Sequence, residues 1–96
     1  MEYVTVEFYF DDTKRNEEII NAKNSIMSLF EQKDICCIEN TNNSLVYRDD
    51  ELKTGKVCWA LNRIADDKTL VNVLKEAYLD VDDREDVLNG FLRIAI

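Results

Sequence analysis

The chain has 96 residues, a length that suits one domain, residues 1–96, with a modest core. Hydrophobic residues make up 46% of it and charged residues 33%, which excludes a disordered chain, and no apolar run is long enough for a transmembrane helix. The formal net charge of −8 disfavours nucleic acid and anionic membranes as partners and favours basic surfaces, although it also suits a role in solubility alone.

The cysteines and the N-terminal segment predict a cytoplasmic protein. Cys36, Cys37 and Cys58 form no disulfide framework, and adjacent cysteines rarely bridge each other. Since the sequence has no histidine to complete a zinc site, we expect reduced thiols, free of metal and packed as small core residues. No basic region precedes the first predicted strand, so no signal peptide is expected.

Residues 2–10 predict the strand around which the rest of the chain is organised, because apolar side chains recur there at every second position. The predicted core face consists of Val4, Val6, Phe8 and Phe10. The opposite face, with Tyr3, Thr5, Glu7 and Tyr9, is amphipathic and suits either solvent or a partner.

A long amphipathic helix is predicted to follow this strand. Asp11, Asp12 and Thr13 are residues that cap a first helical turn. An apolar stripe at spacings of three and four then runs through Ile19, Ala22, Ile26, Leu29 and Phe30, and the helix is predicted to end near residue 33. We expect Val6, Phe8, Ile26, Phe30 and Leu74 to be buried together.

The middle of the chain predicts a β-hairpin, with strands at residues 34–39 and 44–48 joined by an asparagine-rich turn. Residues 56–64 fit either a strand or a helix, and Gly55 and Trp59 favour the strand. Residues 67–79 predict a second helix, because apolar residues recur at helical spacing from Leu70 to Tyr78.

Two interpretations fit the C-terminal segment. One is a single helix from Asp83 to Ala95, and the other is a short helix ending at Gly90 followed by a strand at residues 91–96. The predicted fold is α+β, an antiparallel-rich sheet of three to four strands packed by two or three helices. Its order is β-α-β-β-β-α plus a terminal helix or strand, and the terminal strand would allow a ferredoxin-like βαββαβ variant.

Enzymatic function is not predicted, and no cofactor is expected. Without histidine there is no serine–histidine or cysteine–histidine pair, and neither glycine belongs to a phosphate-binding loop. The alternation of Asp80, Asp82, Arg84 and Asp86 resembles a calcium loop, but an arginine stands at a ligand position and no glycine follows at the turn. No metal site is predicted.

Acidic residues instead form three clusters in predicted loops, and we expect these clusters to bind a partner. They comprise Asp49, Asp50 and Glu51; Asp66 and Asp67; and Asp80, Asp82, Asp83, Glu85 and Asp86. Spread over several loops, such clusters can mimic the phosphate spacing of nucleic acid and steer a basic partner.

The sequence therefore predicts a small acidic protein that binds and inhibits a basic, nucleic-acid-handling partner, either as a nuclease immunity protein or as a phage-type inhibitor of a defence nuclease. The alternative is a structural or regulatory α+β module that self-associates through its sheet as a homodimer. Its interface would then include exposed Tyr3, Tyr9, Tyr47 or Trp59.

Overall fold

The computed structural model describes residues 3–49, 54–83 and 88–93. Its elements are β1 (Tyr3–Phe10), α1 (Asn16–Glu31), β2 (Cys36–Asn40), β3 (Ser44–Asp49), α2 (Thr54–Asp66), α3 (Lys68–Val71), β4 (Leu74–Asp83) and β5 (Leu88–Arg93).

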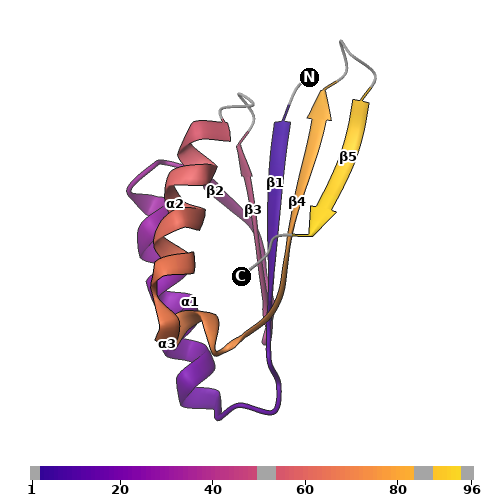
Figure 1. Ribbon diagram of the computed structural model, residues 1–96. Coiled ribbons are helices and arrows are strands. Elements are labelled where there is room, and N and C mark those ends of the chain that lie inside the picture. The colour runs from indigo at the N-terminus through magenta and orange to yellow at the C-terminus, as the bar shows by residue number, and fades with distance from the viewer. Residues whose placement is uncertain (1–2, 50–53, 84–87, 94–96) are drawn as a thin grey trace.

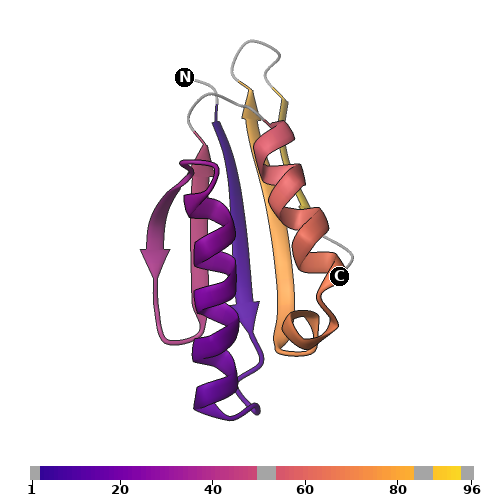
Figure 2. The same cartoon turned by 90° about the vertical axis from the view of Figure 1, so that its left-hand side faces the viewer.

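The strands form one five-stranded sheet in the order β2-β3-β1-β4-β5, and every neighbouring pair is antiparallel. The described helices all lie on one side of this sheet (Figures 1 and 2). The predicted α+β class and antiparallel sheet are confirmed, although the sheet has five strands rather than three or four. The other side of the sheet is called the open face below.

β1 is the central strand and follows the predicted alternation. Its apolar face points to the helices and is at most 1% exposed, whereas the residues of its other face are half-buried. The ring of Phe8 contacts that of Phe30 in α1 edge-on, with centroids 5.8 Å apart, and the ring of Phe30 stacks on that of Tyr47 in β3, with centroids 4.1 Å apart. The predicted group of Val6, Phe8, Ile26 and Phe30 is buried together.

α1 begins and ends slightly inside the predicted bounds. Asp11 does not cap the helix, because its carboxylate accepts hydrogen bonds from the N–H and the hydroxyl of Thr13 in the preceding turn. At the other end the chain leaves the helix through Asp34, which has φ 55°, and the Ile35 N–H returns to the Phe30 carbonyl at 3.2 Å. This left-handed residue is what turns the chain from α1 into β2.

Residues 56–64 belong to α2, so the strand interpretation of this segment was wrong. β3 and β4 both run antiparallel to β1 and flank it, so they run parallel to each other and need a connection that crosses the sheet. A helix provides that connection and buries Val57, Ala60 and Ile64 at helical spacing. Trp59 lies half-buried beside this stripe, with Lys33 and Arg63 over its ring.

Residues 67–79 were predicted as one helix, but only α3 is helical and β4 begins at Leu74. Pairing with β1 explains the difference, because Ala77 lies opposite Phe8 and Leu79 opposite Val6. Leu74, which was expected within the buried group, is only half-buried and packs against its edge. The four strands β1–β4 with α1 and α2 follow the βαββαβ order, although the closing strand is not the one expected.

The C-terminal segment pairs as a strand. β5 covers residues 88–93 and is antiparallel to β4, so both a helix through these residues and a short helix ending at Gly90 were wrong. The terminal-strand alternative is closer, although the strand starts earlier, and residues 94–96 lie outside the described part.

The cysteines were expected in the core, and all three are instead exposed and free. Cys36 and Cys37 lie on β2, which is an edge strand, and Cys58 lies on the solvent side of α2. Within the described residues, no helix has the length and apolar character needed to cross a bilayer.

Phe8→Ala should lower the free energy of unfolding by roughly 3–5 kcal/mol, because it leaves a cavity between β1 and α1. Denaturant unfolding measures this loss. Ile20→Ala is the control, since Ile20 is 48% exposed and its loss should change stability by no more than about 0.5 kcal/mol. Equal unfolding midpoints for the two variants would contradict the central role of β1.

Asp34→Gly should raise the free energy of unfolding by about 1 kcal/mol, because glycine adopts positive φ without the steric cost that a Cβ brings. Asp34→Val should lower it, since a β-branched residue is poorly tolerated there. Thermal melting of both variants measures the two effects, and a change of the same sign in both would contradict this account of the α1 terminus.

Candidate protein-binding face

The predicted acidic residues do not form one surface in the described part of the chain. Asp49 ends β3, is 8% exposed, and pairs with Val4 on the side of the sheet that faces the helices. Asp66 and Asp67 lie at the junction of α2 and α3, at the opposite end of the sheet (Figure 1). Asp67 accepts a hydrogen bond from the Leu70 N–H at 3.2 Å and so caps α3.

The remaining predicted acidic residues are divided between β4 and the part of the chain not described. Asp80 is half-buried on the open face, opposite Thr5. Asp82 and Asp83 complete β4, where a helix start was expected. The other four, Asp50, Glu51, Glu85 and Asp86, lie outside the described residues.

A different set of acidic and aromatic side chains gathers on the open face. The strand registers and the alternation of side chains place them together across β2, β3, β1 and β4. The acidic and aromatic members are Tyr3, Glu7, Tyr9, Glu39, Glu76, Tyr78 and Asp80.

Tyr9 is the centre of this face. Its ring meets that of Tyr78 edge-on, with centroids 6.0 Å apart, and its hydroxyl donates a hydrogen bond to Glu7 Oε2 at 3.3 Å. Burial raises the pKa of the Tyr9 hydroxyl above its usual value, and the negative charges of Glu7, Glu39 and Glu76 raise it further. The phenol therefore stays protonated among these carboxylates and can donate to them.

The charge on the open face is unbalanced. Among the side chains described there, four carboxylates (Glu7, Glu39, Glu76 and Asp80) face one guanidinium, that of Arg48, which lies 4.4 Å from the ring centroid of Tyr3. The face therefore presents negative charge around aromatic rings, which suits lysine and arginine side chains of a partner.

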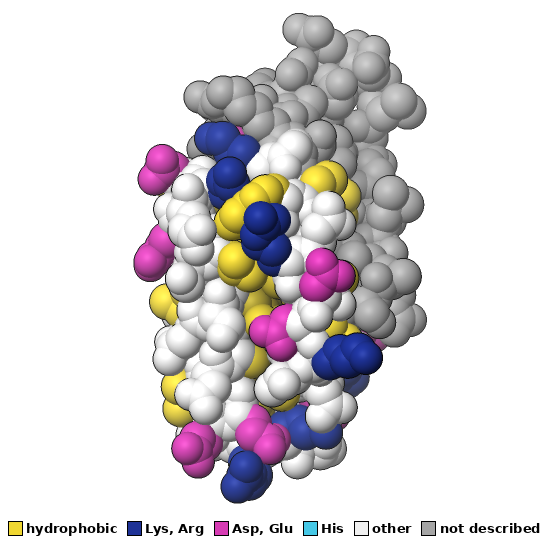
Figure 3. All heavy atoms as spheres, turned by 60° about the vertical axis from the view of Figure 1, so that its left-hand side comes forward, with side chains coloured by type: hydrophobic (Ala, Val, Ile, Leu, Met, Phe, Trp, Pro, Cys, Tyr) yellow, Lys and Arg dark blue, Asp and Glu magenta, His cyan; other side chains and the backbone are white. Residues whose placement is uncertain are grey.

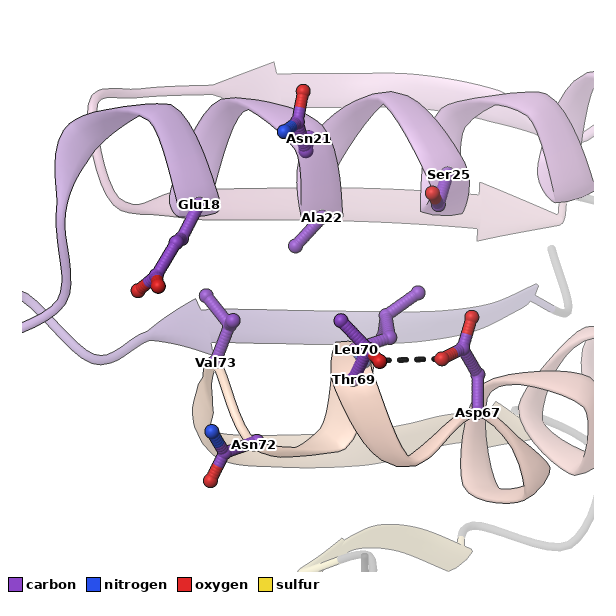
Figure 4. A pocket seen from close by; sticks show the side chains of 9 residues that line it. All are labelled: Glu18, Asn21, Ala22, Ser25, Asp67, Thr69, Leu70, Asn72 and Val73. Atoms are coloured by element: carbon purple, nitrogen blue, oxygen red, sulfur yellow. Dashed lines mark hydrogen bonds between the residues drawn. The ribbon is translucent and has the colours of Figure 1, made fainter.

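The helix side of the molecule is different. Figure 3 shows hydrophobic side chains along the hollow between the helices, with charges of both signs around them. A cavity of about 180 Å³ lies there between α1 and α3 (Figure 4). Ala22, Leu70 and Val73 line it, and the carboxylates of Glu18 and Asp67 reach it from the two sides.

The chemistry of this cavity is limited. Both carboxylates already have partners in the chain, because Glu18 is 3.3 Å from the Arg15 guanidinium and Asp67 caps α3. The nine residues that line the cavity include the hydroxyls of Ser25 and Thr69 but no cysteine, lysine, tyrosine or histidine. In the described part of the chain, no three acidic, cysteine or histidine side chains are grouped as a metal site requires.

Two of the four aromatic residues proposed for a self-association interface lie on the open face, namely Tyr3 and Tyr9. Tyr47 does not, since it is 3% exposed and stacks on Phe30 in the core. Trp59 lies on the helix side under two cations.

Comparisons with known proteins establish the fold and nothing more. No protein-family model and no curated protein matches the chain. Among solved structures, it is similar to the guanylate cyclase domain of RhGC from Catenaria anguillulae, determined in complex with GTP, with a TM-score of 0.52 and 9% sequence identity. The match covers 98% of this chain and 66% of that domain, so the chain spans just under two thirds of its length.

The sequence contained part of the signal for the open face. Glu7 and Tyr9 were recognisable as the outer face of the first strand, because they alternate with its apolar residues. The sequence did not identify Glu39, Glu76 and Tyr78 as members of this face, because only the pairing of the strands brings them near Tyr9. Glu76 and Tyr78 were also expected to lie in a helix.

Glu7→Gln should lower the pKa of Tyr9 towards its ordinary value, because it removes both a negative charge and a charged hydrogen-bond acceptor. The pKa should remain somewhat raised, since burial is the largest cause. NMR titration of isotope-labelled tyrosine rings measures the shift. Tyr47 is the control, because its pKa is raised chiefly by burial and Glu7 is not among the causes.

The sign of the effect on stability follows from the same shift. A group whose pKa is higher in the folded state than in the unfolded state adds stability to the folded protein. This stability is fully present at pH values below the unfolded-state pKa, and it is lost as the pH rises to the folded-state pKa. In both proteins the loss should begin above about pH 10, the ordinary pKa of tyrosine, but it should be smaller in Glu7→Gln, because the folded-state pKa of Tyr9 is less raised there. Equal alkaline unfolding of both proteins would contradict the coupling of Tyr9 to Glu7.

Proposed function

We propose that this protein binds and blocks a basic, nucleic-acid-handling protein through the open face of its sheet. One observation carries the proposal. Among the side chains that the structure describes on one face of the sheet, four carboxylates and one guanidinium surround the tyrosines, and none of the described helices covers that face (Figure 1).

Two properties of this face suit it to a basic protein surface. Unbalanced negative charge speeds the approach of a basic surface and rejects acidic ones. Half-buried tyrosines contribute contact area at little cost in conformational entropy, which is why tyrosine is enriched at the energetic centres of interfaces. A partner that uses lysine and arginine to hold phosphates has the complementary surface, and occupying that surface excludes nucleic acid.

The proposal assigns no reaction, cofactor or metal to this chain. It covers both an immunity protein against a nuclease toxin and a phage-type inhibitor of a defence nuclease, each acting in the cytoplasm. The two differ in the gene beside this one: a nuclease toxin in the first case and other phage genes in the second.

Self-association through the open face is the competing function, and the pair of Tyr9 and Tyr78 favours it. The charges of the same face oppose it. Two copies packed face to face would bring the carboxylates of one open face, among them Glu7, Glu39 and Glu76, close to those of the other, and like charges across an interface are strongly unfavourable.

Glu39→Lys should weaken binding of the basic partner, and Glu31→Lys should not. Both glutamates are exposed, and both variants change the net charge equally, but Glu39 belongs to the open face and Glu31 ends α1 on the helix side. The partner is first captured from extracts of the source cell on the immobilised wild-type protein. Association rates are then measured at increasing salt, and inhibition of the partner's nucleic-acid binding or cleavage is measured in parallel.

We expect Glu39→Lys to slow association by about tenfold, the lower end of the range for electrostatic steering, with added salt reducing the difference. Melting temperatures should remain equal. Equal rates for the two variants would exclude the open face as the binding surface. A captured partner whose nucleic-acid activity is unchanged by saturating protein would rule out the inhibitor function.

A further inference from the structure

β2 is an edge strand that none of the described helices or strands covers on its outer side. Its five residues, Cys36–Asn40, are all exposed, and among the described strands it pairs only with β3. The outer edge of such a strand presents backbone N–H and C=O groups that can pair with another strand. Figure 2 shows β2 at the outer side of the sheet, away from α2.

The side chains of β2 lack most of the features that protect edges from pairing. The strand contains no lysine and no proline, and its one charged residue is Glu39. At its centre is Ile38, which is 53% exposed. The register shift between Cys37 and Glu39 leaves it without a Cα partner in β3, and this bulge is, besides the charge of Glu39, the one edge-protecting feature of the strand. An exposed isoleucine therefore marks the middle of an open edge.

Charge distinguishes between the possible occupants of this edge. A basic partner is drawn to the open face, where Glu7, Glu76 and Asp80 lie in addition to Glu39, rather than to the edge of β2, which has Glu39 alone. Two copies of this chain, each with a net charge of −8, repel each other least where their contact carries the fewest charges. The edge of β2 therefore fits a second copy better than it fits a basic protein.

The sequence of β2 also suits pairing with itself. Antiparallel pairing about a two-fold axis at Ile38 places the two isoleucines side by side and sets Glu39 opposite Cys37 of the second copy. The two Glu39 carboxylates are then kept apart.

We propose that β2 is the interface through which two copies of this chain pair, edge to edge and antiparallel, about a two-fold axis near Ile38. The two sheets then form one continuous sheet, with all helices on one side and both open faces on the other. The pairing itself does not depend on the proposed function. If that function is correct, the dimer presents two acidic faces side by side and can bind a dimeric partner at both.

The test uses the two most exposed isoleucines of the described residues, Ile38 and Ile20, as a matched pair. Sedimentation velocity of the reduced protein is measured up to roughly millimolar concentration, because a contact of five residues per copy is smaller than a standard interface. Wild type and Ile20→Lys should both form a dimer as concentration rises. Ile38→Lys should raise the dissociation constant at least about tenfold, because it brings two like charges to the axis.

A second measurement keeps the proposal testable if Ile38→Lys impairs folding. In a background with Cys36, Cys37 and Cys58 replaced by serine, Ile38→Cys should form a disulfide-linked dimer on mild oxidation, and Ile20→Cys should not. A wild-type protein that stays monomeric throughout would overturn the proposal, as would equal cross-linking of the two cysteine variants.

Failure of this proposal can be distinguished from failure of the proposed function. Ile38→Lys keeps every carboxylate and tyrosine of the open face, so one copy of it should still bind the basic partner if that function is correct. The added charge beside Glu39 should slow association at low salt, and the difference from wild type should disappear at high salt. Loss of dimerisation with retained binding is therefore the expected result, and loss of binding alone counts against the open face.

Discussion

The structure depends on the central strand β1, which buries one face beneath the helices and pairs with β3 and β4 along its two edges. Val4, Val6, Phe8 and Phe10 are almost completely removed from water, and β3 and β4 satisfy the backbone of the same strand on both sides. Burying an apolar side chain contributes about 1.5–3 kcal/mol, so this one strand accounts for a large part of the stability of so small a domain. The helices can lie only where these side chains point.

The arrangement of the other elements follows from that constraint. Because β3 and β4 both pair antiparallel with β1, the chain between them must cross the sheet, and it crosses as a helix on the side where β1 needs cover. The two long helices, α1 and α2, both lie on that side (Figure 1). The opposite face of the sheet therefore retains polar and aromatic side chains, and β2, one of the two edge strands, has no partner on its outer side among the described strands.

These two surfaces differ in the kind of contact they favour. On the open face, burial and three carboxylates hold the Tyr9 phenol in its protonated form, so aromatic area and negative charge coincide there. The edge of β2 carries one charge and an exposed isoleucine, so backbone pairing dominates its chemistry. A molecule with both surfaces can bind an unlike partner on its face while pairing with a copy of itself at its edge.

The sequence by itself determined the elements whose periodicity has one interpretation: β1, α1 and the hairpin of β2 and β3. It also indicated that Glu7 and Tyr9 share the outer face of β1. Tertiary structure decided the rest. Residues 56–64 fit both a helix and a strand, and the need to cross the sheet makes them a helix. Residues 74–79 continue the helical spacing that begins at Leu70, yet pairing with β1 makes them a strand. The same pairing brought Glu39 and Glu76 to Tyr9, since the neighbours of a residue in a sheet depend on strand order, which local sequence does not encode.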